Sequence, residues 1–548
     1  MQKRHVVTVF LIRDEEDSTP SPEFSPLRRH SSFSIHGRRS SLPAKQGSRV
    51  LLIKRGEQAR TYRDHWAGIS GLLDPADPTP LHRAYAELQK ATSLASREVA
   101  LIRTALPLIY SAPSLQTEWH VHPFLFKLHV RSEHVKIELE NEGVKWVRVD
   151  EVNEIAGGKE TEGMQMVPYL REAFHRVYLP EPVHQALLEM HLDRSSGAQQ
   201  LAHQAICVLR ELARSHRLQK CVADTRELWL AYVNIGWHLS QIRPTMRAGI
   251  VNEVARVLLS CKPAEGWTLE KVENQVEQAV TEIENERPLL EERIRLGVVE
   301  ALGIGAGERE SVTPEDENEP DSDEESEEDG RPSRENQSRI HVLTMSYSSS
   351  IALALEHVID ILPPNLQLMI SVAEARPLCE GGALVKRLAA RIRGKRNVKI
   401  ALITDAAVGY FMQGVTHILF GADRIFPDGS VRNKIGSFML ALFARYFHRK
   451  IFCISTSDKI GEDDEAEEEN DVEEVTKVFG QDPFWQQRDG GLDGEQVRVR
   501  NVYFEKVPAE LVSGYVMDCS EKPGVVGRDE VEKAWQEKRH AGRVFEEL

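Results

Sequence analysis

The sequence predicts an α/β protein made of an α+β amino-terminal domain, a helical subdomain and a domain with a mainly parallel sheet. Three observations lead to this prediction. Strand-like runs dominate residues 1–175, helix-like runs fill residues 181–304, and short apolar strands alternate with helices over residues 339–530. Short apolar strands that alternate with helices indicate βαβ units, and ligands of such sheets bind at the carboxyl ends of the strands.

The amino-terminal domain, residues 1–175, begins with two strand-like runs, Val6–Ile12 and Arg49–Lys54. Between them, residues 14–48 are rich in Ser, Pro and Arg, a composition typical of a disordered surface insertion. A helix is predicted from about Leu81 to Ala91, and two further strands at Trp119–Val130 and Val144–Val152.

The helical subdomain, residues 181–304, contains five segments with helical periodicity. They are Val183–Leu192, Gly197–His216, Glu227–His238, Pro244–Ser260 and Leu269–Arg287. This subdomain is linked in sequence to the sheet domain, so we expect the two to pack together.

The sheet domain shows five buried strand patterns: Ile340–Thr344, Leu366–Val372, Val398–Thr404, Thr416–Gly421 and Lys450–Ser455. Helices are expected after the first strand, at Ala383–Ile392, and from Asn433 to about Phe447. Polar residues follow the strands, and we expect them to share the carboxyl edge of the sheet: Ser346, Arg376, Asp405, Asp423, Asn433 and Lys434.

The turn after the first of these strands is rich in hydroxyl groups, Ser346-Tyr-Ser-Ser-Ser350. A strand that enters a helix through such a turn presents free N–H groups and the positive end of the helix dipole, which suit a phosphate. Any Ser-rich turn of this kind meets the description, so the turn needs support from its neighbours.

The negative sign of the formal net charge, −16, comes from two segments. Residues 310–329 carry 12 acidic side chains and residues 461–474 carry 10, with no basic residue in either. Without these 22 charges the chain would carry +6, a balance that suits small anions. We expect residues 305–338 to be an acidic disordered linker and residues 459–475 an acidic insertion.

Composition also bears on location and partners. No apolar run approaches the roughly 20 residues that span a bilayer, so no membrane association is expected. The six cysteines form no CxxC pair and suit a reducing compartment, so cytoplasmic localisation is expected. No Lys/Arg stripe interleaved with aromatic residues argues for direct nucleic-acid binding. Arg38-x-x-Ser41-x-Pro43 resembles a phosphoserine motif bound by 14-3-3 proteins, although such motifs also arise by chance.

Residues 49–94 resemble the Nudix family. Trp66-Ala-Gly-Ile-Ser-Gly71 leads to a box in which Gly71, Asp77 and Glu87 match conserved positions of the family pattern. Lys90 and Ala91 stand where the paired glutamates belong, and Ala86 stands in place of the box arginine. Because that chemistry needs several carboxylates around divalent cations, we expect a degenerate domain with no metal and no hydrolase activity.

Residues 183–520 resemble the initiation factor 2B family. This family contains the alpha, beta and delta regulatory subunits of eukaryotic translation initiation factor 2B, methylthioribose-1-phosphate isomerase and ribose-1,5-bisphosphate isomerase. The motifs that carry the resemblance are Arg194-Ser-Ser-Gly-Ala198, Ile242-Arg-Pro-Thr245, Val342–Ser348, Glu374-Ala-Arg-Pro-Leu-Cys-Glu-Gly381, Gly421-Ala-Asp-Arg-Ile425, Asn433-Lys-Ile-Gly436 and Tyr503–Pro508. The resemblance implies a Rossmann-like sheet domain and a two-fold dimer.

The resemblance also implies a site. Asp423 matches the catalytic aspartate of the isomerases, and Ser346 stands where those enzymes have a catalytic cysteine. From the residue alone, Asp423 could equally cap a turn or pair with Arg424. The expected ligand-binding residues are Arg194, Gly197, Ala198, Arg243, Ser348, Ser349, Arg376, Asn433 and Lys434. A phosphate would also relieve the unfavourable position of Lys434 at a predicted helix start.

The functional prediction follows from the missing thiol. A serine hydroxyl without a neighbouring base is a poorer acid or base than a thiol, so a non-catalytic or regulatory protein that binds a phosphorylated sugar or nucleotide is preferred. Such a protein would be linked to translation initiation, as a homodimer or within an initiation factor 2B-type assembly, without a cofactor. The alternative is an aldose–ketose isomerase acting on ribose 1,5-bisphosphate or methylthioribose 1-phosphate. A second alternative is a Nudix hydrolase of nucleoside diphosphate derivatives.

Overall fold

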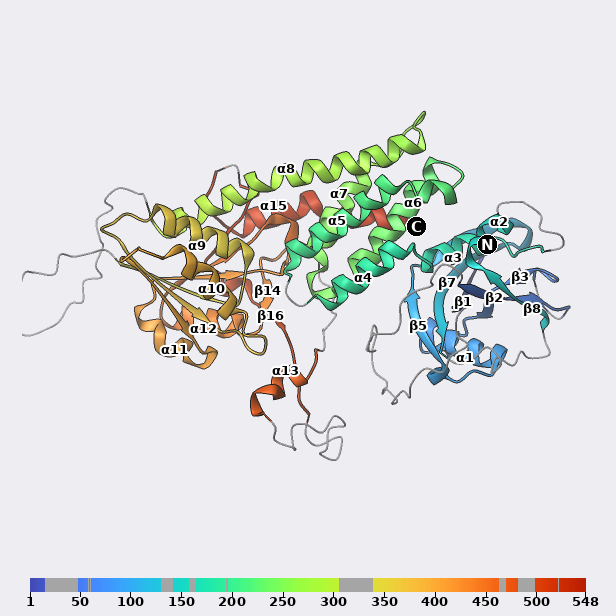
Figure 1. The fold of residues 1–548 in the computed structure, drawn as a ribbon, viewed down its shortest axis with the longest axis horizontal. Coiled ribbons are helices and arrows are strands. Elements are labelled where there is room, and N and C mark those ends of the chain that lie inside the picture. The colour runs from blue at the N-terminus through green and yellow to red at the C-terminus, as the bar shows by residue number, and fades with distance from the viewer. Residues whose placement is uncertain are drawn as a thin grey trace, which may run out of the picture.

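The computed structural model describes residues 1–14, 48–57, 59, 61–129, 141–156, 164–193, 196–304, 339–462, 470–480, 498–520 and 522–548. These residues form an elongated molecule with a mixed-sheet body at the amino-terminal end, a helical body in the middle and a parallel-sheet body at the other end (Figure 1). Arg194, Ser41 and the whole of 305–338 lie outside the described residues, as does most of 14–48.

The amino-terminal body is one mixed sheet with helices on both faces. Its strand order is β3-β2-β1-β7-β5, in which β1 and β7 are parallel and the other pairs are antiparallel. Strand β4 pairs with β1, β6 with β7, and β8 with β2. The strands are β1 (Gln2–Arg13), β2 (Arg49–Arg55), β3 (Trp66–Ala67), β4 (Ile69–Leu72), β5 (Val99–Thr104), β6 (Leu108–Ala112), β7 (Thr117–Leu128) and β8 (Asn141–Arg148).

Alternation along β1 explains the two covered faces. Val7, Val9 and Leu11 pack in a core with α1 (Pro80–Thr92), whereas Phe10 and Ile12 pack in a core with α3 (Leu170–Val177). Helix α1 begins at Pro80 because Thr79 accepts a hydrogen bond from the His82 N–H (3.1 Å). The strand predicted for 144–152 ends at Arg148, where α2 (Val149–Ala156) begins.

The helical body contains α4 (Glu181–Leu192), α5 (Ala198–Ser215), α6 (Thr225–Gln241), α7 (Arg247–Ser260) and α8 (Leu269–Ala301). Helix α8 extends well beyond the predicted end at Arg287, even though Pro288 removes one backbone donor. The later turns are held by packing, because Ile294 and Val298 belong to the core of the parallel-sheet body. The chain end returns to the helical body, where Val544 and Phe545 are buried (Figure 1).

The parallel-sheet body has the strand order β11-β10-β9-β12-β15-β17-β18, in which only β18 is antiparallel to its neighbour. The predicted strands appear as β9 (Arg339–Met345), β10 (Gln367–Ala373), β11 (Val398–Ile403), β12 (His417–Gly421) and β15 (Lys450–Ile454). Two short strands follow that were not predicted, β17 (Gly514–Val516) and β18 (Val525–Val526).

Helices cover both faces of this sheet. The end of α8 packs in one core with α9 (Ser349–Ile361) and α10 (Gly381–Arg391), and α12 (Ser437–Tyr446) packs in the other with α15 (Arg528–Lys538). A small antiparallel sheet, β13 (Arg424–Ile425), β14 (Val431–Lys434) and β16 (Phe504–Val507), lies beside the carboxyl edge. The prediction of a helix from Asn433 is therefore wrong, because Asn433 and Lys434 end β14.

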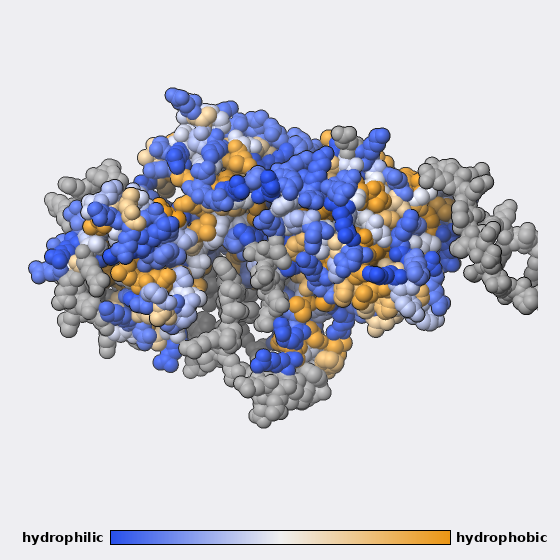
Figure 2. All heavy atoms as spheres, turned by 180° about the vertical axis from the view of Figure 1, so that it is seen from behind, coloured by the Kyte–Doolittle hydropathy of each residue, from blue (hydrophilic) through white to orange (hydrophobic). Residues whose placement is uncertain are grey.

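No helix among the described residues combines the length and the apolar composition that crossing a bilayer requires. The face seen in Figure 2 mixes hydrophilic and hydrophobic residues over its whole length.

The amino-terminal and helical bodies meet through buried polar groups around the end of α3. Arg103 of β5 donates hydrogen bonds to Val177 O (3.1 Å) and to His184 Nδ1 of α4 (2.8 Å). His238 of α6 bonds Arg176 O through Nε2 (2.7 Å). Burial is the main cause that lowers the pKa of His175 and His184 to about 4 and that of His238 to about 3.

This junction should make the protein sensitive to mild acid. A histidine whose folded pKa lies below its unfolded value stabilises the fold above about pH 6.5, and this contribution is lost as the pH falls toward the folded pKa. Between about pH 7.5 and pH 5 we expect a loss of about 2 kcal/mol per histidine in the free energy of unfolding, measured by urea denaturation. The side chain in His238→Gln keeps an N–H donor but does not titrate. Over the same pH range, this variant should therefore lose about 2 kcal/mol less in the free energy of unfolding than the parent chain. If the variant and the parent chain show the same pH dependence, this prediction is wrong.

Candidate functional site

The candidate site lies at the point where the order of the parallel strands changes direction. From β9 the chain proceeds to β10 and β11 on one side, whereas β12 and β15 lie on the other side. The crevice at the carboxyl ends of two such strands is the usual ligand site of an open parallel sheet. Ser346 follows β9 and Asp423 follows β12, so both leave adjacent strands that are about 5 Å apart.

Ser346 adopts a left-handed backbone conformation (φ 60°) as the chain turns from β9 toward α9. Its N–H bonds Ala373 O (3.3 Å), and its buried hydroxyl donates to Glu380 Oε2 (2.9 Å). The expectation that this serine lacks a neighbouring base is therefore wrong. A hydroxyl bonded to a carboxylate can pass a proton to it.

Glu380 reaches Ser346 because the loop after β10 is held in place. The Asp405 carboxylate accepts hydrogen bonds from the N–H groups of Ala375 and Arg376, both at 2.8 Å. The loop then closes onto α10, where the Gly381 N–H bonds Glu374 O (3.0 Å). Glu380 stands directly before the first residue of α10.

Lys434 completes this group from the end of β14. Its Nζ lies 3.0 Å from Glu380 Oε1 and sits over the rings of Tyr503 (4.8 Å) and Phe504 (5.0 Å). The sequence predicts that Lys434 faces the positive end of a helix dipole. In the structure it does not, because α12 starts only at Ser437. The first amides of α12 are instead bonded by Glu505, which accepts from Gly436 (2.6 Å) and Phe438 (2.9 Å).

Asp423 is surrounded by charge. Its backbone N–H bonds Arg432 O (2.9 Å). Burial raises the pKa of Asp423, and the nearby cations Lys459 and Lys434 partly oppose this effect. Lys459 is itself buried and donates to Ala422 O (2.7 Å). A carboxyl group whose pKa is raised in this way can exchange protons closer to neutral pH than an exposed aspartate.

Ser348 and Asn433 approach the same edge. The Ser348 hydroxyl accepts from the Ile351 N–H (3.5 Å) and so caps α9, whose first residue is Ser349. A Cβ on Gly421 would lie 3.1 Å from Ser348 Oγ and 3.6 Å from Asn433 Oδ1. These two side chains therefore flank the end of β12, two residues before Asp423.

The helical body borders the site on the other side. Gly197 precedes α5, and Ala198 is the first residue of this helix. Ala198 O and Lys459 Cγ both lie close to Gly249, at 3.8 and 3.9 Å from the position that a Cβ on this glycine would take. Arg243 is buried, donates to Asp193 O (2.7 Å) below this helix start, and acts electrostatically on Asp423. The first turn of α5 thus faces the edge that carries Asp423.

Arg376 stands apart from this group. Its backbone is fixed by Asp405, but its guanidinium donates to Val475 O (3.4 Å), in a segment predicted to be a disordered insertion. Part of that insertion, residues 459–475, is ordered, since α13 (Glu473–Thr476) begins within it and Lys459 ends a short 3₁₀ helix.

Sequence reasoning missed two groups of this site, Glu380 and Lys459. Glu380 belongs to a loop motif that the sequence does single out, and a carboxylate at the start of a helix on the carboxyl edge is a usable signal for it. Lys459 falls at the predicted start of the acidic insertion, although it follows β15 by only five residues.

The sequence model of the family described as "Initiation factor 2 subunit family" matches residues 194–520. The chain belongs to the Initiation factor 2 subunit family. This match includes Ser346, Glu380, Asp423, Lys434 and Lys459, and it leaves the amino-terminal body outside.

Two curated relatives of this family member are methylthioribose-1-phosphate isomerases. That of Bacillus cereus is 33% identical over 162 residues, which are 28% of this chain and 42% of the relative. That of Cronobacter sakazakii is 38% identical over 168 residues, which are 29% of this chain and 45% of the relative. The chain therefore spans less than half the length of these relatives.

Among solved structures, the translation initiation factor eIF-2B of Pyrococcus horikoshii is 20% identical to this chain, with a TM-score of 0.44. The matched region covers 64% of this chain and 98% of the chain in that structure.

The amino-terminal residues expected to form a degenerate Nudix box lie close together, with Gly71 on β4, Asp77 in the segment before α1 and Glu87 on α1. Arg83 forms an ion pair with Glu87 and lies 3.7 Å from Asp77 Oδ2. Gly71 packs against the Glu87 side chain. A basic residue therefore pairs with these two carboxylates, one helical turn before Glu87, at a position that the sequence did not single out.

Proposed function

We propose that this family member binds a phosphorylated sugar at the carboxyl edge of its parallel sheet and interconverts the aldose and ketose forms. The observation that carries the proposal is the arrangement around the β9–β12 crevice. Ser346 and Lys434 both contact Glu380, and Lys434 and Glu380 both act electrostatically on Asp423. Two groups able to exchange protons thus leave neighbouring strands, with cations beside them.

Isomerisation of a sugar 1-phosphate needs such a pair. The bond between C1 and the ring oxygen breaks, and the ring oxygen takes up a proton. The hydrogen on C2 moves to C1, and the C2 hydroxyl loses its proton to become a carbonyl, so that atoms and charge balance. A protonated Asp423 would give its proton to the ring oxygen, and Glu380 would accept the proton of the C2 hydroxyl through the Ser346 hydroxyl.

The cations and helix starts suit the phosphate. Lys434, Lys459 and Arg243 place positive charge around Asp423, and α5 and α9 begin at the same edge. The curated relatives support a sugar 1-phosphate as substrate, because those that match are named methylthioribose-1-phosphate isomerases. Ribose 1,5-bisphosphate and methylthioribose 1-phosphate are the two substrates to test.

A second candidate function is non-catalytic binding of the same ligand class, as a regulatory protein linked to translation initiation. The observation that favours it is the hydroxyl of Ser346 where the isomerases resembled by this sequence have a thiol. A thiol loses its proton far more readily than a hydroxyl, so the Ser346–Glu380 pair would have to make up the difference.

We further propose that the amino-terminal body is a degenerate Nudix domain that serves as a scaffold. Arg83 neutralises Asp77 and Glu87, which would otherwise attract a divalent cation, so Nudix hydrolysis is not proposed.

Exposed aromatic residues on α11 (Val408–Phe411) and α12, Tyr410 and Tyr446, offer a surface for a homodimer or a larger assembly. Cytoplasmic localisation and 14-3-3 binding at phosphorylated Ser41 remain predictions.

The proposal is tested by turnover and binding in parallel. Ribose 1,5-bisphosphate and methylthioribose 1-phosphate are incubated with the full chain, and ketose formation is followed by nuclear magnetic resonance. We expect ketose to accumulate, and we expect either substrate to raise the melting temperature because it binds only the folded state. A melting shift without ketose would favour the non-catalytic candidate, and the absence of both would rule out the site.

A further inference from the structure

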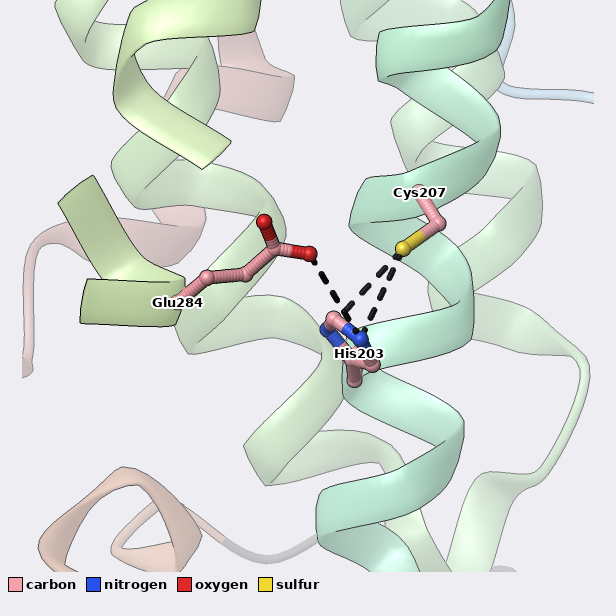
Figure 3. Close-up of side chains that lie close together, drawn as sticks. All are labelled: His203, Cys207 and Glu284. Atoms are coloured by element: carbon pink, nitrogen blue, oxygen red, sulfur yellow. Dashed lines mark hydrogen bonds and ion pairs between the residues drawn. The ribbon is translucent and has the colours of Figure 1, made fainter. Parts of the chain in front are cut away.

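A second cluster of reactive side chains lies in the helical body, away from the strand edge. His203 and Cys207 are four residues apart on α5 and therefore share one face of that helix. Glu284 comes from α8, which runs alongside α5, and its carboxylate points toward the other two side chains (Figure 3). The three residues are half-buried.

The spacing of the donor atoms fits one small metal ion. Cys207 Sγ lies 3.7 Å from His203 Nε2, and His203 Nε2 lies 3.7 Å from Glu284 Oε1. Tetrahedral zinc, with ordinary bond lengths, separates a sulfur and a nitrogen ligand by about 3.6 Å, and a nitrogen and an oxygen ligand by about 3.4 Å. The ligand atoms of all three residues lie within 4.8 Å of one another.

Arg210 donates hydrogen bonds to two of the three side chains, Glu284 and Cys207. Its Nη1 donates to Glu284 Oε2 (2.6 Å), so that Oε1 is the oxygen turned toward His203. Its Nη2 donates to Cys207 Sγ (3.4 Å). Groups that orient metal ligands from behind in this way are typical of metal sites.

The charges allow a cation here. The His203 Nε2 atom faces both Cys207 Sγ and Glu284 Oε1. The neighbouring Arg287 is paired with Glu253 (3.1 Å). The thiolate and the carboxylate carry two negative charges against the two positive charges of a divalent ion, and Arg210 adds one positive charge beside them. Binding would release the proton of the Cys207 thiol.

We propose that His203, Cys207 and Glu284 form a zinc site that ties α5 to α8, with a water molecule as the fourth ligand. One thiolate, one imidazole and one carboxylate suit zinc better than magnesium or calcium, which prefer oxygen ligands alone. The ion would hold α5 five residues beyond its start at Ala198, and so would steady the helix start beside Asp423.

The test uses the full chain after removal of metals with a chelator. Zinc is titrated by isothermal calorimetry, and cobalt is added as a spectroscopic probe because a thiolate bound to cobalt gives a charge-transfer absorption. We expect one zinc per chain, a rise in melting temperature with zinc, and the thiolate–cobalt absorption.

Variants decide whether these residues are the ligands. Cys207→Ser should abolish the cobalt absorption. Cys207→Ser and His203→Gln should each weaken zinc binding by more than about tenfold. Cys221→Ser replaces another half-buried cysteine of the helical body, and it should change neither the cobalt absorption nor the zinc affinity. If zinc neither binds nor stabilises the parent chain, or if Cys221→Ser has the same effect as Cys207→Ser, the three residues make only a hydrogen-bonded contact between helices and the proposal fails.

Discussion

Replacing Asp423 by Asn is expected to lower the rate of sugar-phosphate isomerisation by about 10²- to 10⁴-fold, the usual contribution of a positioned general acid or base. The amide has the same shape as the carboxyl group but cannot give or take a proton near neutral pH. The backbone N–H of residue 423 still bonds Arg432 O. The loss should therefore appear in kcat, measured as ketose formed per chain at saturating substrate.

Stability separates a catalytic role from a structural one. Because burial raises the pKa of Asp423 above its unfolded value, the charged carboxylate costs stability as the pH rises through the folded pKa. Asparagine removes that cost, so the melting temperature at neutral pH should be maintained or raised. Asp428→Asn, at an exposed carboxylate five residues later, is the matched control and should retain activity. If Asp423→Asn turns over substrate normally, Asp423 only supports the turn.

The parallel sheet could be predicted from sequence because its strands are continuous apolar runs. The strands β9, β10, β11, β12 and β15 begin and end within one residue of the predicted positions. The small sheet that carries Lys434 could not, because β14 is a four-residue strand with polar side chains and has no period that distinguishes it from a helix start. Gly436, at φ 101°, is the residue that separates this strand from α12.

The site was predictable only in part for a related reason. Residues that directly follow a predicted strand, such as Ser346 and Asp423, are placed at the carboxyl edge by topology alone. Glu380 and Lys459 reach the same region through a loop and a short 3₁₀ helix whose paths depend on tertiary contacts, such as the bonds from Asp405 to the loop before Glu380. The pairing of Ser346 with Glu380, which changes the chemical interpretation of this serine, is such a contact.

Gly381→Ala is the substitution expected to affect stability most strongly at this site. A Cβ at this position would overlap the carbonyl oxygen of Ala373 and would lie 3.0 Å from both its carbonyl carbon and Glu374 Cα. These are backbone atoms of the last residue of β10 and of the residue after it, so they cannot move aside as a side chain would. We expect a loss of about 2 kcal/mol or more in the free energy of unfolding, measured by urea denaturation.

The neighbouring residue provides the control. A Cβ on Gly382 would meet no atom within 4 Å, and this residue lies in the first turn of α10, so Gly382→Ala should stabilise the chain by up to about 1 kcal/mol. The two variants should also differ in function, because a shift of α10 at Gly381 would withdraw Glu380 from Ser346 and Lys434. Gly381→Ala should then lose the melting shift with sugar phosphates, whereas Gly382→Ala keeps it. Equal behaviour of the two variants would show that the close packing of Gly381 on Ala373 does not position Glu380.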